Sequence, residues 1–448
     1  MNRKKSNPFR VILFAYLLSM FVFSVLFYLP VFHEPGVSLT YRDALFTSVS
    51  AVSVTGLVTI NVVETFNWGG ILVLSLAIQL GGIGIMTLAT FAWMMLGKRI
   101  NLSQRLLIIV DQNRVQNQFS GLVRLMSSLI VIALCIEGAG ALILGTYYLR
   151  FFDEPFEAYL QGAFASLSAF TNAGFDVTGQ SLAPFVDDYF VQCITILLVF
   201  AGSIGFPVIL ECIEYIKSRK RTFKFSLFTK LTTTTYFLVF LIGAFGIWFL
   251  ERDLAFATLS WHEQLSQAVF FSATTRSAGL STVDLAAFHI PVLLFMSLLM
   301  IIGASPSSVG GGIRTTTLAV MALTLRSFAM GKKHVHVFGR RIHEEDQQKS
   351  FVVLSIFAGL LFLAILLIMA FEQDTQVTLL QVLVETASAF GTCGLSLGIT
   401  SELSLPSQVV LMVLMVIGRV GIIAVLFSFR GDRKGEHYQY STERILIG

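Results

Sequence analysis

The chain has few charged residues for its length. Of 448 residues, only 13% are Asp, Glu, Lys or Arg, whereas a soluble globular domain carries about 25%. Hydrophobic residues make up 55% of the chain, and the mean hydropathy is +0.77. A water-soluble fold cannot bury that much apolar surface, so the composition predicts an all-α polytopic membrane protein and excludes a nucleic-acid-binding protein. We attribute the formal net charge of +4 to basic loops rather than to a basic face.

Cysteine and proline are also scarce. The four cysteines are far apart and form no CxxC pair, which excludes a disulfide framework and gives no zinc site. The nine prolines argue against long disordered linkers.

Eight apolar stretches are long enough to cross a bilayer, which requires about 20 residues. The first follows a basic N-terminus but is longer than a signal-peptide core, so we interpret it as a retained span. An even number of spans places both chain ends on one side. The stretches are 11–30, 69–96, 122–149, 189–213, 231–250, 290–328, 351–371 and 406–429.

The distribution of Lys and Arg sets the orientation. The N-terminus and the connections after the second, fourth and sixth spans are basic, whereas the opposite loops are mainly acidic. By the positive-inside rule, both ends are predicted to be cytoplasmic. The basic positions include Arg3, Lys4, Lys5, Lys98, Arg99, Arg105, Arg114, Lys217, Lys220, Lys332, Lys333, Arg340 and Arg341.

A short pattern recurs four times between the two spans of each pair. Aligned on one glycine, the copies are FTSVSAVSVTGL, FASLSAFTNAGF, VFFSATTRSAGL and VETASAFGTCGL. The anchor glycines, Gly56, Gly174, Gly279 and Gly394, are 118, 105 and 115 residues apart. The chain is thus predicted to be four tandem units of span, short segment and span around a pseudo-fourfold central pore. The predicted divisions are repeat 1 (1–100), repeat 2 (101–220), repeat 3 (221–335), repeat 4 (336–430) and a cytoplasmic tail (431–448).

A second glycine signature lies in phase with the first. It follows the anchor glycines by 25, 28, 24 and 24 residues and occurs as GGIG, GSIG, GASP and GRVG. Two signatures in register support the repeat independently.

The short segments are too short to cross, so each is expected to enter and leave the membrane on one side. Non-helical backbone at that depth is tolerated only inside protein or along a wet cavity. A helix of about ten residues, up to Ser50 or Ser168, would point its negative end inward and favour a cation. The residues after it would present carbonyl oxygens, as in potassium filters. The predicted filter residues are Ser53, Val54, Thr55, Gly56, Thr171, Asn172, Ala173, Gly174, Arg276, Ser277, Ala278, Gly279, Gly391, Thr392, Cys393 and Gly394.

Two points qualify this interpretation. Glycines also allow helices to pack closely in membranes. Close packing would be the preferred explanation for a single copy of the motif, whereas four copies in phase favour the filter. Arg276 would repel cations if it faced the path, so its side chain is expected to turn outward, with Glu263 or Asp284 as suggested partners.

These motifs resemble those of the Trk/Ktr/HKT superfamily of potassium transporters, and most of all the bacterial Ktr membrane subunit. The resemblance rests on VTGL, NAGF, SAGL and TCGL, on a glycine-rich break in the sixth span and on an arginine in the eighth, and it covers residues from about 10 to 430. Glycine at all four anchor positions resembles the potassium-selective members. The resemblance implies no enzyme activity, transport of K⁺, and Na⁺ as a candidate activator or symported ion.

The resemblance also implies an assembly. By this resemblance, the functional unit is expected to be a homodimer with one pore per subunit, seated on a cytoplasmic ring of nucleotide-binding RCK-type regulatory subunits. This chain has neither a GxGxxG after a strand nor a GxxxxGK[ST], so we expect it to bind no cofactor itself and to need that partner. The implied location is the plasma membrane of a bacterium.

The sixth span is predicted to break at GASPSSVGGG, because proline and four glycines do not favour a continuous helix. The break follows the filter closely, so we expect an intramembrane gate; the alternative is a water-lined packing kink.

Arg419 occupies the position of Gly82, Ser203 and Ala304 in the other repeats and is predicted to be an electrostatic barrier, with a salt bridge to a neighbouring helix as the alternative. The predicted gate residues are Ser305, Pro306, Ser307, Ser308, Gly310, Gly311, Gly312 and Arg419.

Other ionisable residues carry weaker expectations. Glu137 lies in mid-span, where a proton or sodium coupling site is possible but a hydrogen bond to a neighbouring helix is preferred. His334, His336 and His343 are expected on a solvated or partner-facing surface rather than at a metal. The charged segment from Lys332 to Lys349 either docks the regulatory ring or is simply solvated.

The leading function is therefore potassium uptake through a pore. A sodium-conducting or sodium-coupled relative is the alternative, and a polytopic membrane enzyme is a remote one. An enzyme would need convergent nucleophile, base or metal ligands at one depth, which the spans do not provide.

Overall fold

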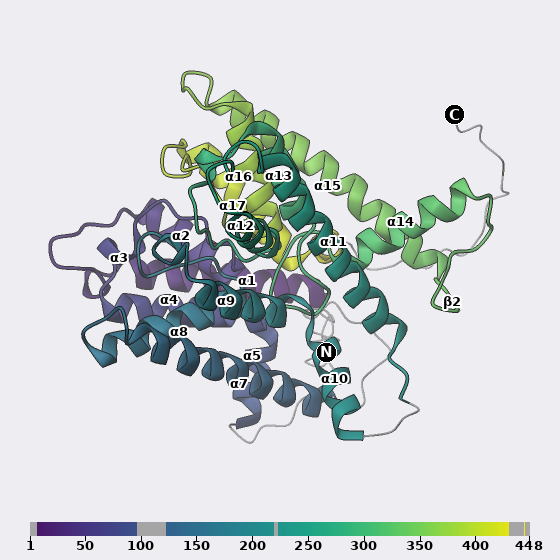
Figure 1. The fold of residues 1–448 in the computed structure, drawn as a ribbon, viewed down its shortest axis with the longest axis horizontal. Helices are drawn as coiled ribbons and strands as arrows, with labels where there is room; N and C mark the ends of the chain where they lie inside the picture. Colours follow the sequence, from purple (N-terminus) through teal and green to yellow (C-terminus); the bar gives the residue numbers. More distant parts are fainter. Residues whose placement is uncertain (1–6, 96–121, 219–222, 430–442, 444–448) are drawn as a thin grey trace, which may run out of the picture.

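The computed structural model describes residues 7–95, 122–218, 223–429 and Glu443. Almost all regular structure in these residues is helical (Figure 1). The exception is an antiparallel hairpin in which His336 of β1 (His336–Val337) pairs with Arg341 of β2 (Arg340–Arg341). The fold is the all-α class expected from the composition.

Four units of long helix, short helix and broken helix follow one another along the chain. The long helices are α1 (Pro8–Tyr28), α7 (Leu122–Tyr148), α11 (Leu227–Glu251) and α15 (Glu344–Phe371). The short helices are α2 (Tyr41–Ser53), α8 (Pro155–Thr171), α12 (Trp261–Thr274) and α16 (Leu379–Gly391). The broken helices are α4 (Trp68–Ile83) with α5 (Ile85–Met95), α9 (Tyr189–Ser203) with α10 (Phe206–Ser218), α13 (Ile290–Ile301) with α14 (Thr315–Ala329), and α17 (Leu405–Val420) with α18 (Ile422–Phe429). Single turns connect them: α3 (Val62–Thr65), η1 (Pro30–Phe32), η2 (Ala183–Phe185) and η3 (Leu285–Ala287).

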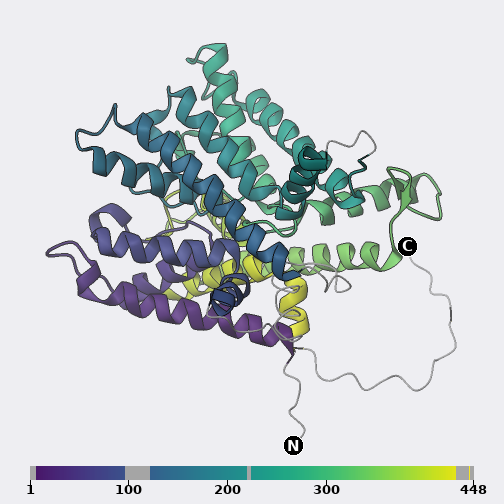
Figure 2. The same cartoon turned by 90° about the horizontal axis from the view of Figure 1, so that it is seen from below.

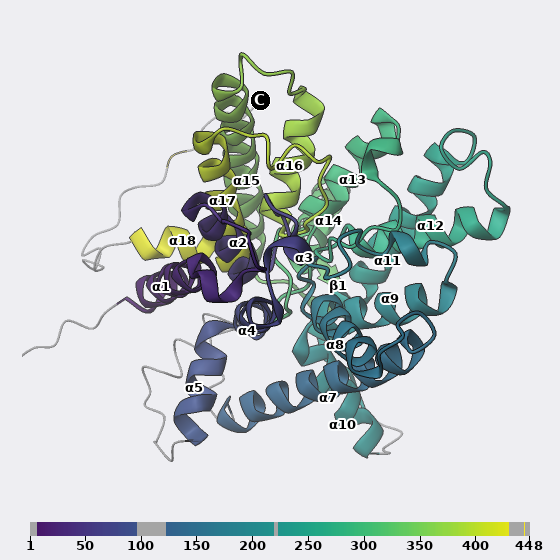
Figure 3. The same cartoon turned by 90° about the vertical axis from the view of Figure 1, so that its left-hand side faces the viewer.

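The four units close into a ring. Each short helix packs against the broken helix of the preceding unit: α8 against α4, α12 against α9, α16 against α13, and α2 against α17. Figure 3 shows the units in chain order around a common centre, from purple through blue and teal to yellow. The ring brings the short helices of all four units to the middle of the molecule.

The first described residues meet the end of α18 (Figure 2). The Asn7 Nδ2 donates to the Phe427 carbonyl at 2.8 Å, and the Arg10 Nε donates to the Ser428 carbonyl at 2.6 Å. The start of repeat 1 and the end of repeat 4 therefore lie on the same side of the molecule.

Among the described residues, four helices are long and apolar enough to cross a membrane, or six if each of two bent pairs counts as one span. The four are the first helices of the four units. Their outward faces carry large exposed apolar side chains such as Phe14, Leu142 and Phe362, as expected for surfaces in contact with lipid.

The second span of every unit is broken, and the expectation of a continuous span was therefore wrong in units 1, 2 and 4. The glycine-rich break predicted in the sixth span is present, but α4, α9 and α17 also end at or next to a glycine with positive φ: Gly84 at 100°, Gly205 at 98° and Gly421 at 91°. A right-handed helix cannot contain such a residue. The axes of α9 and α10 differ by 100°, and those of α17 and α18 by 98°. The last glycine of the second signature is therefore a helix terminator in three repeats.

The predicted repeat divisions at 100/101, 220/221 and 430/431 lie outside the described residues, as do the basic residues from Lys98 to Arg114 and the tail apart from Glu443. The division at 335/336 falls inside a folded connection. Ile342 donates its N–H to the Val335 carbonyl at 3.0 Å, and both side chains pack on Val320 of α14.

Candidate ion pathway

The four anchor glycines meet at the centre of the ring. All four have positive φ, at 88°, 69°, 69° and 97° in chain order. A Cβ on Gly56 would lie 2.9 Å from the Cα of Gly174, one on Gly279 would lie 3.0 Å from the Cα of Gly394, and one on Gly394 would lie 3.2 Å from the Cα of Gly56. Residues from opposite ends of the chain are therefore in contact at this point.

Main-chain oxygens face this centre. A Cβ on Gly394 would lie 2.5 Å from the oxygen of Thr55, and one on Gly174 would lie 3.1 Å from the oxygen of Ala278. The equivalent Cβ atoms would overlap the oxygens of Ala173 and Cys393. The carbonyl before each glycine thus points at the glycine of an adjacent repeat, and only hydrogen fits on that face of the glycine. We refer to residues 53–56, 171–174, 276–279 and 391–394 as the filter segments.

A second backbone feature recurs in every filter segment and was not anticipated. The residue two positions before each anchor glycine is left-handed although it is not glycine: Val54, Asn172, Ser277 and Thr392 have φ between 47° and 81°. Such a conformation costs about 1–2 kcal/mol for a residue with a side chain. Side chains at these positions are unrelated, so no sequence pattern pointed to it.

The short helices extend further than expected. In repeats 1, 2 and 4 the helix ends three residues before the anchor glycine, at Ser53, Thr171 and Gly391, rather than near Ser50 or Ser168. In repeat 3 it ends five residues before it, at Thr274. The non-helical part is therefore shorter than predicted in repeats 1 and 2, and it is two residues longer in repeat 3 than in the other repeats.

A buried hydroxyl ties each filter segment to its own short helix. Ser50 and Ser388 accept the N–H of Gly56 and Gly394, each at 3.0 Å. In the other two repeats the hydroxyl donates to the carbonyl after the glycine, from Ser168 to Phe175 at 2.5 Å and from Thr274 to Leu280 at 2.6 Å. The sequence signal was a hydroxyl five or six residues before every anchor glycine, which we had not used.

Filter segments 3 and 4 are linked to each other. The Ser277 hydroxyl lies 2.9 Å from the Gly391 oxygen and 3.0 Å from the Thr392 oxygen. The N–H of Gly311 donates to the hydroxyls of Ser277 at 3.1 Å and Thr392 at 2.9 Å. Side chains of two filter segments thus hold the loop that interrupts the sixth span.

The loop from Gly303 to Gly312 lies against repeats 2 and 4. Ser305 and Val309 donate their N–H groups to the carbonyls of Ser203 and Gly202 of repeat 2, at 3.0 Å and 3.2 Å. Gly312 donates to the Gly418 carbonyl of repeat 4 at 3.3 Å. Two side chains also hold the loop from within. The Ser308 hydroxyl donates to the Ser305 carbonyl at 2.6 Å, and Arg314 donates to the carbonyls of Ser305 and Gly310. Ser307 is left-handed, with a φ of 56°. Pro306 follows Ser305, and the loop is directly adjacent to filter segments 3 and 4.

Arg419 is buried and links the loop to repeat 1. Its guanidinium donates to the carbonyl of Val309 in the loop and to those of Gly81 and Gly82 in α4, the last at 2.8 Å. None of the salt bridges among the described residues involves Arg419, so its partners are main-chain oxygens rather than an acidic side chain on a neighbouring helix.

Arg276 turns outward from the centre, but the suggested partners were wrong. Its Nη1 donates to the Tyr236 carbonyl of α11 at 2.5 Å. Glu263 instead accepts the Ser260 N–H at 2.7 Å in the capping box of α12, and Asp284 accepts the Ala286 N–H at 3.0 Å. Both carboxylates are needed at the ends of local helices, which leaves Arg276 to a different environment.

Glu137 behaves as the preferred interpretation expected. Its side chain is 8% exposed, and its Oε2 accepts the Gln79 amide of the neighbouring α4 at 2.9 Å. The hydrogen bond joins repeats 1 and 2.

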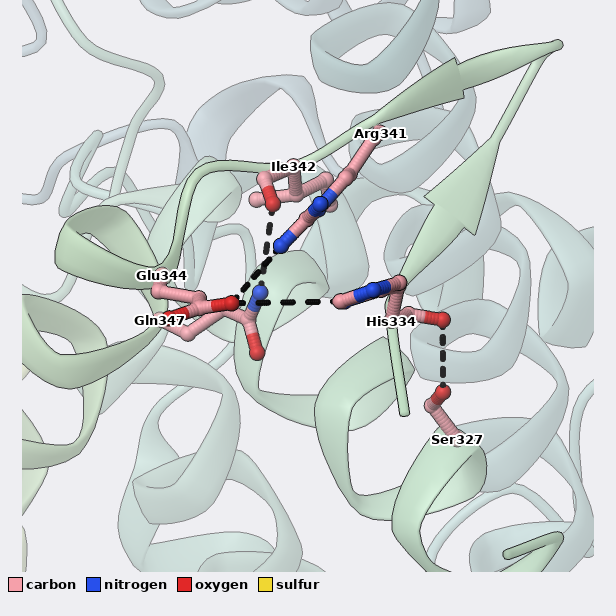
Figure 4. Close-up of polar contacts among 6 residues, drawn as sticks. All are labelled: Ser327, His334, Arg341, Ile342, Glu344 and Gln347. Atoms are coloured by element: carbon pink, nitrogen blue, oxygen red, sulfur yellow. Dashed lines mark hydrogen bonds and ion pairs between the residues drawn. The ribbon is translucent and has the colours of Figure 1, made fainter. Parts of the chain in front are cut away.

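The histidine-containing connection between α14 and α15 is a folded hairpin (Figure 4). Glu344 is its centre: its Oε1 lies 2.7 Å from Arg341 Nη2 and 3.9 Å from His334 Nδ1. Gln347 donates to the Ile342 carbonyl at 3.2 Å, and Ser327 donates to the His334 carbonyl at 3.2 Å. His334 therefore contributes to the base of the hairpin, and β1 and β2 project from it.

The fold defines a multi-pass membrane protein built from four span, short helix and span units around one centre. The sequence matches the TrkH family of cation transport proteins over residues 17–436, and the chain belongs to this family. That membership confirms the resemblance drawn from the filter motifs and places the chain among transport proteins.

Curated relatives match over nearly their full length. The Ktr system potassium uptake protein D of Bacillus subtilis is 49% identical over 442 residues, covering 99% of this chain and 97% of that protein. The Ktr system potassium uptake protein B of Vibrio alginolyticus is 35% identical over 451 residues, covering 100% and 96%. The potassium/sodium uptake protein NtpJ of Enterococcus hirae is 31% identical over 451 residues, covering 100% and 98%.

A solved structure has the same fold. The potassium transporter TrkH from Vibrio parahaemolyticus superimposes with a TM-score of 0.74 over 94% of this chain and 84% of that one, at 17% sequence identity. At that identity the likeness concerns the fold alone.

Proposed function

We propose that this chain is the pore-forming subunit of a bacterial potassium uptake system and that K⁺ passes between the four filter segments. The convergence of four anchor glycines and four preceding carbonyls on one point carries the proposal. A ring of main-chain oxygens can replace the hydration shell of K⁺. The C-terminal ends of four short helices add partial negative charge at the same place. The names of two Ktr relatives agree with this substrate.

The oxygens of Thr55, Ala173, Ala278 and Cys393 are the proposed K⁺ ligands. The side chains of the filter segments are engaged elsewhere: Asn172 donates to Ser203 at 2.7 Å, and Thr171 donates to the Leu167 carbonyl at 2.6 Å. Backbone coordination explains why the four segments share conformation but not side chains.

The loop from Gly303 to Gly312, held by Arg419, is the proposed gate. Its hydrogen bonds to repeats 2 and 4 and to filter segments 3 and 4 place peptide groups beside the proposed pathway, where they would obstruct an ion. Opening would require the loop to break these hydrogen bonds and form others. A regulatory partner that binds the open state more tightly could supply the free energy for this change.

A sodium-conducting or sodium-activated transporter is the second candidate. The relative named a potassium/sodium uptake protein favours it, because that protein is matched over its whole length. Comparison of Rb⁺ and Na⁺ uptake, each with and without the other ion, separates the two candidates.

The partner is proposed to be a cytoplasmic ring of RCK-type subunits that bind nucleotide, acting on a homodimer of this chain. The hairpin supplies a candidate contact, since Phe338 at its tip is 52% exposed between Arg340 and the neighbouring lysines. Both ends of the chain would then be cytoplasmic, on the hairpin side, in the bacterial cell membrane.

The test is Rb⁺ uptake by bacteria that lack their own potassium transporters, with and without a co-expressed regulatory subunit, across a range of Na⁺ concentrations. The proposal predicts saturable Rb⁺ uptake that K⁺ inhibits and that the regulatory subunit stimulates. Absence of Rb⁺ uptake in cells whose membranes contain the folded chain would refute it. A Phe338→Ala variant should reduce stimulation by the partner, whereas Trp261→Ala, exposed at the start of α12, should not.

A further inference from the structure

Arg276 is the one charged residue in the filter segments, and it is completely buried, with 0% of its surface exposed. A guanidinium removed from water is costly unless its charge is compensated. None of the salt bridges in the described ranges includes it. Its compensation must come from groups other than a carboxylate.

Three aromatic rings surround the guanidinium. Its central carbon lies 4.0 Å from the ring centre of Tyr236, 5.3 Å from that of Phe240 and 5.8 Å from that of Phe200. The rings also order one another, since Phe200 meets Tyr236 at 5.5 Å and Phe240 at 4.9 Å, both edge to face. A cation held over aromatic faces is attracted by the negative charge of the ring faces, and the attraction is strongest in a desolvated site.

The cage is built by two repeats. Phe200 belongs to α9 of repeat 2, whereas Tyr236 and Phe240 belong to α11 of repeat 3. The Nη1 of Arg276 donates to the Tyr236 carbonyl, while its Nε and Nη2 have no hydrogen-bond partner among the described residues. The aromatic rings are therefore the main neighbours of the guanidinium nitrogens Nε and Nη2.

In repeat 3 the short helix gives less support at the position of Arg276, although Ala278 still donates its N–H to the Thr274 carbonyl at 3.0 Å. The helix ends at Thr274, two residues earlier relative to the anchor glycine than in the other repeats. The Arg276 N–H reaches the Ala273 carbonyl only at 3.4 Å. The anchoring that helical hydrogen bonds give to Ser53, Thr171 and Gly391 is weak at this position.

We propose that Arg276 is a positioning residue for ion selectivity: its aromatic cage holds filter segment 3 outward, fixing the Ala278 oxygen in the ring and keeping the positive charge away from the ion. The inference rests on the proposed function, because selectivity has meaning only if the ring binds K⁺. A lysine cannot replace Arg276, because an ammonium lacks the flat face that lies against the Tyr236 ring. Loss of the cage lets segment 3 move, and a loosened ring admits the smaller Na⁺.

The test measures Rb⁺ uptake, Na⁺ uptake and the thermal stabilisation of the purified full-length protein by K⁺ and by Na⁺. Arg276→Met and Arg276→Lys are compared with Arg252→Met, an exposed arginine that also lies over aromatic rings, those of Trp248 and Phe249. We expect both Arg276 variants to lower the Rb⁺/Na⁺ ratio by about tenfold or more, and Arg252→Met to leave it unchanged.

Two substitutions of Tyr236 distinguish the contribution of its ring from that of its hydroxyl. Tyr236→Phe keeps the ring and should keep the wild-type ratio, whereas Tyr236→Leu removes it and should reproduce the Arg276 variants. If Arg276→Met does not reach the membrane folded, Phe240→Leu tests the same cage with a smaller change.

The inference is overturned if a folded Arg276→Met protein retains the wild-type Rb⁺/Na⁺ ratio and the wild-type preference for K⁺ in thermal stabilisation. It is equally overturned if Tyr236→Phe and Tyr236→Leu behave alike. Failure of the wild-type protein to take up Rb⁺ would instead refute the proposed function, so the two failures are distinguishable.

Discussion

Gly394 and Thr55 lie 339 positions apart in the sequence, yet a Cβ on Gly394 would lie 2.5 Å from the main-chain oxygen of Thr55. This proximity closes the ring between the last repeat and the first. It also explains why each anchor position is glycine, because a methyl group there would displace a carbonyl proposed to bind the ion.

We expect Gly394→Ala to abolish selective Rb⁺ uptake and Gly398→Ala to preserve it. Both glycines have positive φ, 97° and 85°, so alanine costs each about 1–2 kcal/mol of backbone strain. Only Gly394 has a main-chain oxygen in the way, since nothing lies within 4 Å of a Cβ on Gly398. Uptake assays on matched amounts of membrane protein compare them, and equal loss in both variants would contradict the steric argument.

Arg419→Ala is expected to raise ion flux. The substitution removes a positive charge and also the guanidinium that donates to Val309 of the loop and to Gly81 and Gly82 of repeat 1. Rb⁺ flux into proteoliposomes without regulatory subunit measures the effect, with the exposed Arg326→Ala as control.

A fall in uptake without any gain in flux would contradict the barrier. Deletion of Ser305 to Gly310 tests the loop itself, and unchanged uptake in a folded deletion variant would remove the loop as the gate.

Ser388→Ala should destabilise the protein and weaken ion selectivity. It leaves the partly buried N–H of Gly394 without its side-chain acceptor at 3.0 Å, which costs about 1 kcal/mol or more. Thermal unfolding in detergent, with and without K⁺, measures the loss. Ser75→Ala serves as control, because the Ser75 hydroxyl only donates to the Ile71 carbonyl of its own helix at 2.8 Å. Equal unfolding temperatures for the two variants would show that the hydroxyl does not hold the filter segment.

Glu137→Gln is expected to preserve Rb⁺ uptake and its response to Na⁺. Glutamine has nearly the same shape and can still accept from Gln79, so the link between α7 and α4 remains. Uptake measured across Na⁺ concentrations and pH provides the test. A variant that folds but no longer responds to Na⁺ would identify Glu137 as a coupling site instead.

Much of the architecture was predictable because it repeats. The anchor glycines and the second glycine signature recur in phase in all four units, so weak local signals combined into one strong prediction of four units. The anchor glycine has the same physical role in each unit, because it adopts a positive φ at the centre of the ring. The break in the sixth span was readable because Pro306 and several glycines lie together.

Other features were not readable from any single stretch. The breaks at Gly84, Gly205 and Gly421 were missed because glycine inside an apolar run is compatible with a helix, so these signatures served only to align the repeats. The partners of Arg276 were misassigned because Glu263 and Asp284 are close in sequence, whereas Phe200 of another repeat is not. The left-handed residues before the glycines leave no mark on side-chain identity.

The sequence by itself determined that the chain lies in a membrane, that it is fourfold repeated, and that its sixth span must break, since apolar length, charge bias, proline and glycine act locally. Only the tertiary structure decided which oxygens meet at the centre, what holds the Gly303–Gly312 loop and where two buried arginines point. Those arrangements depend on packing between repeats more than 100 residues apart, and the hydrogen bonds and ring contacts that fix them exist only once the ring has closed.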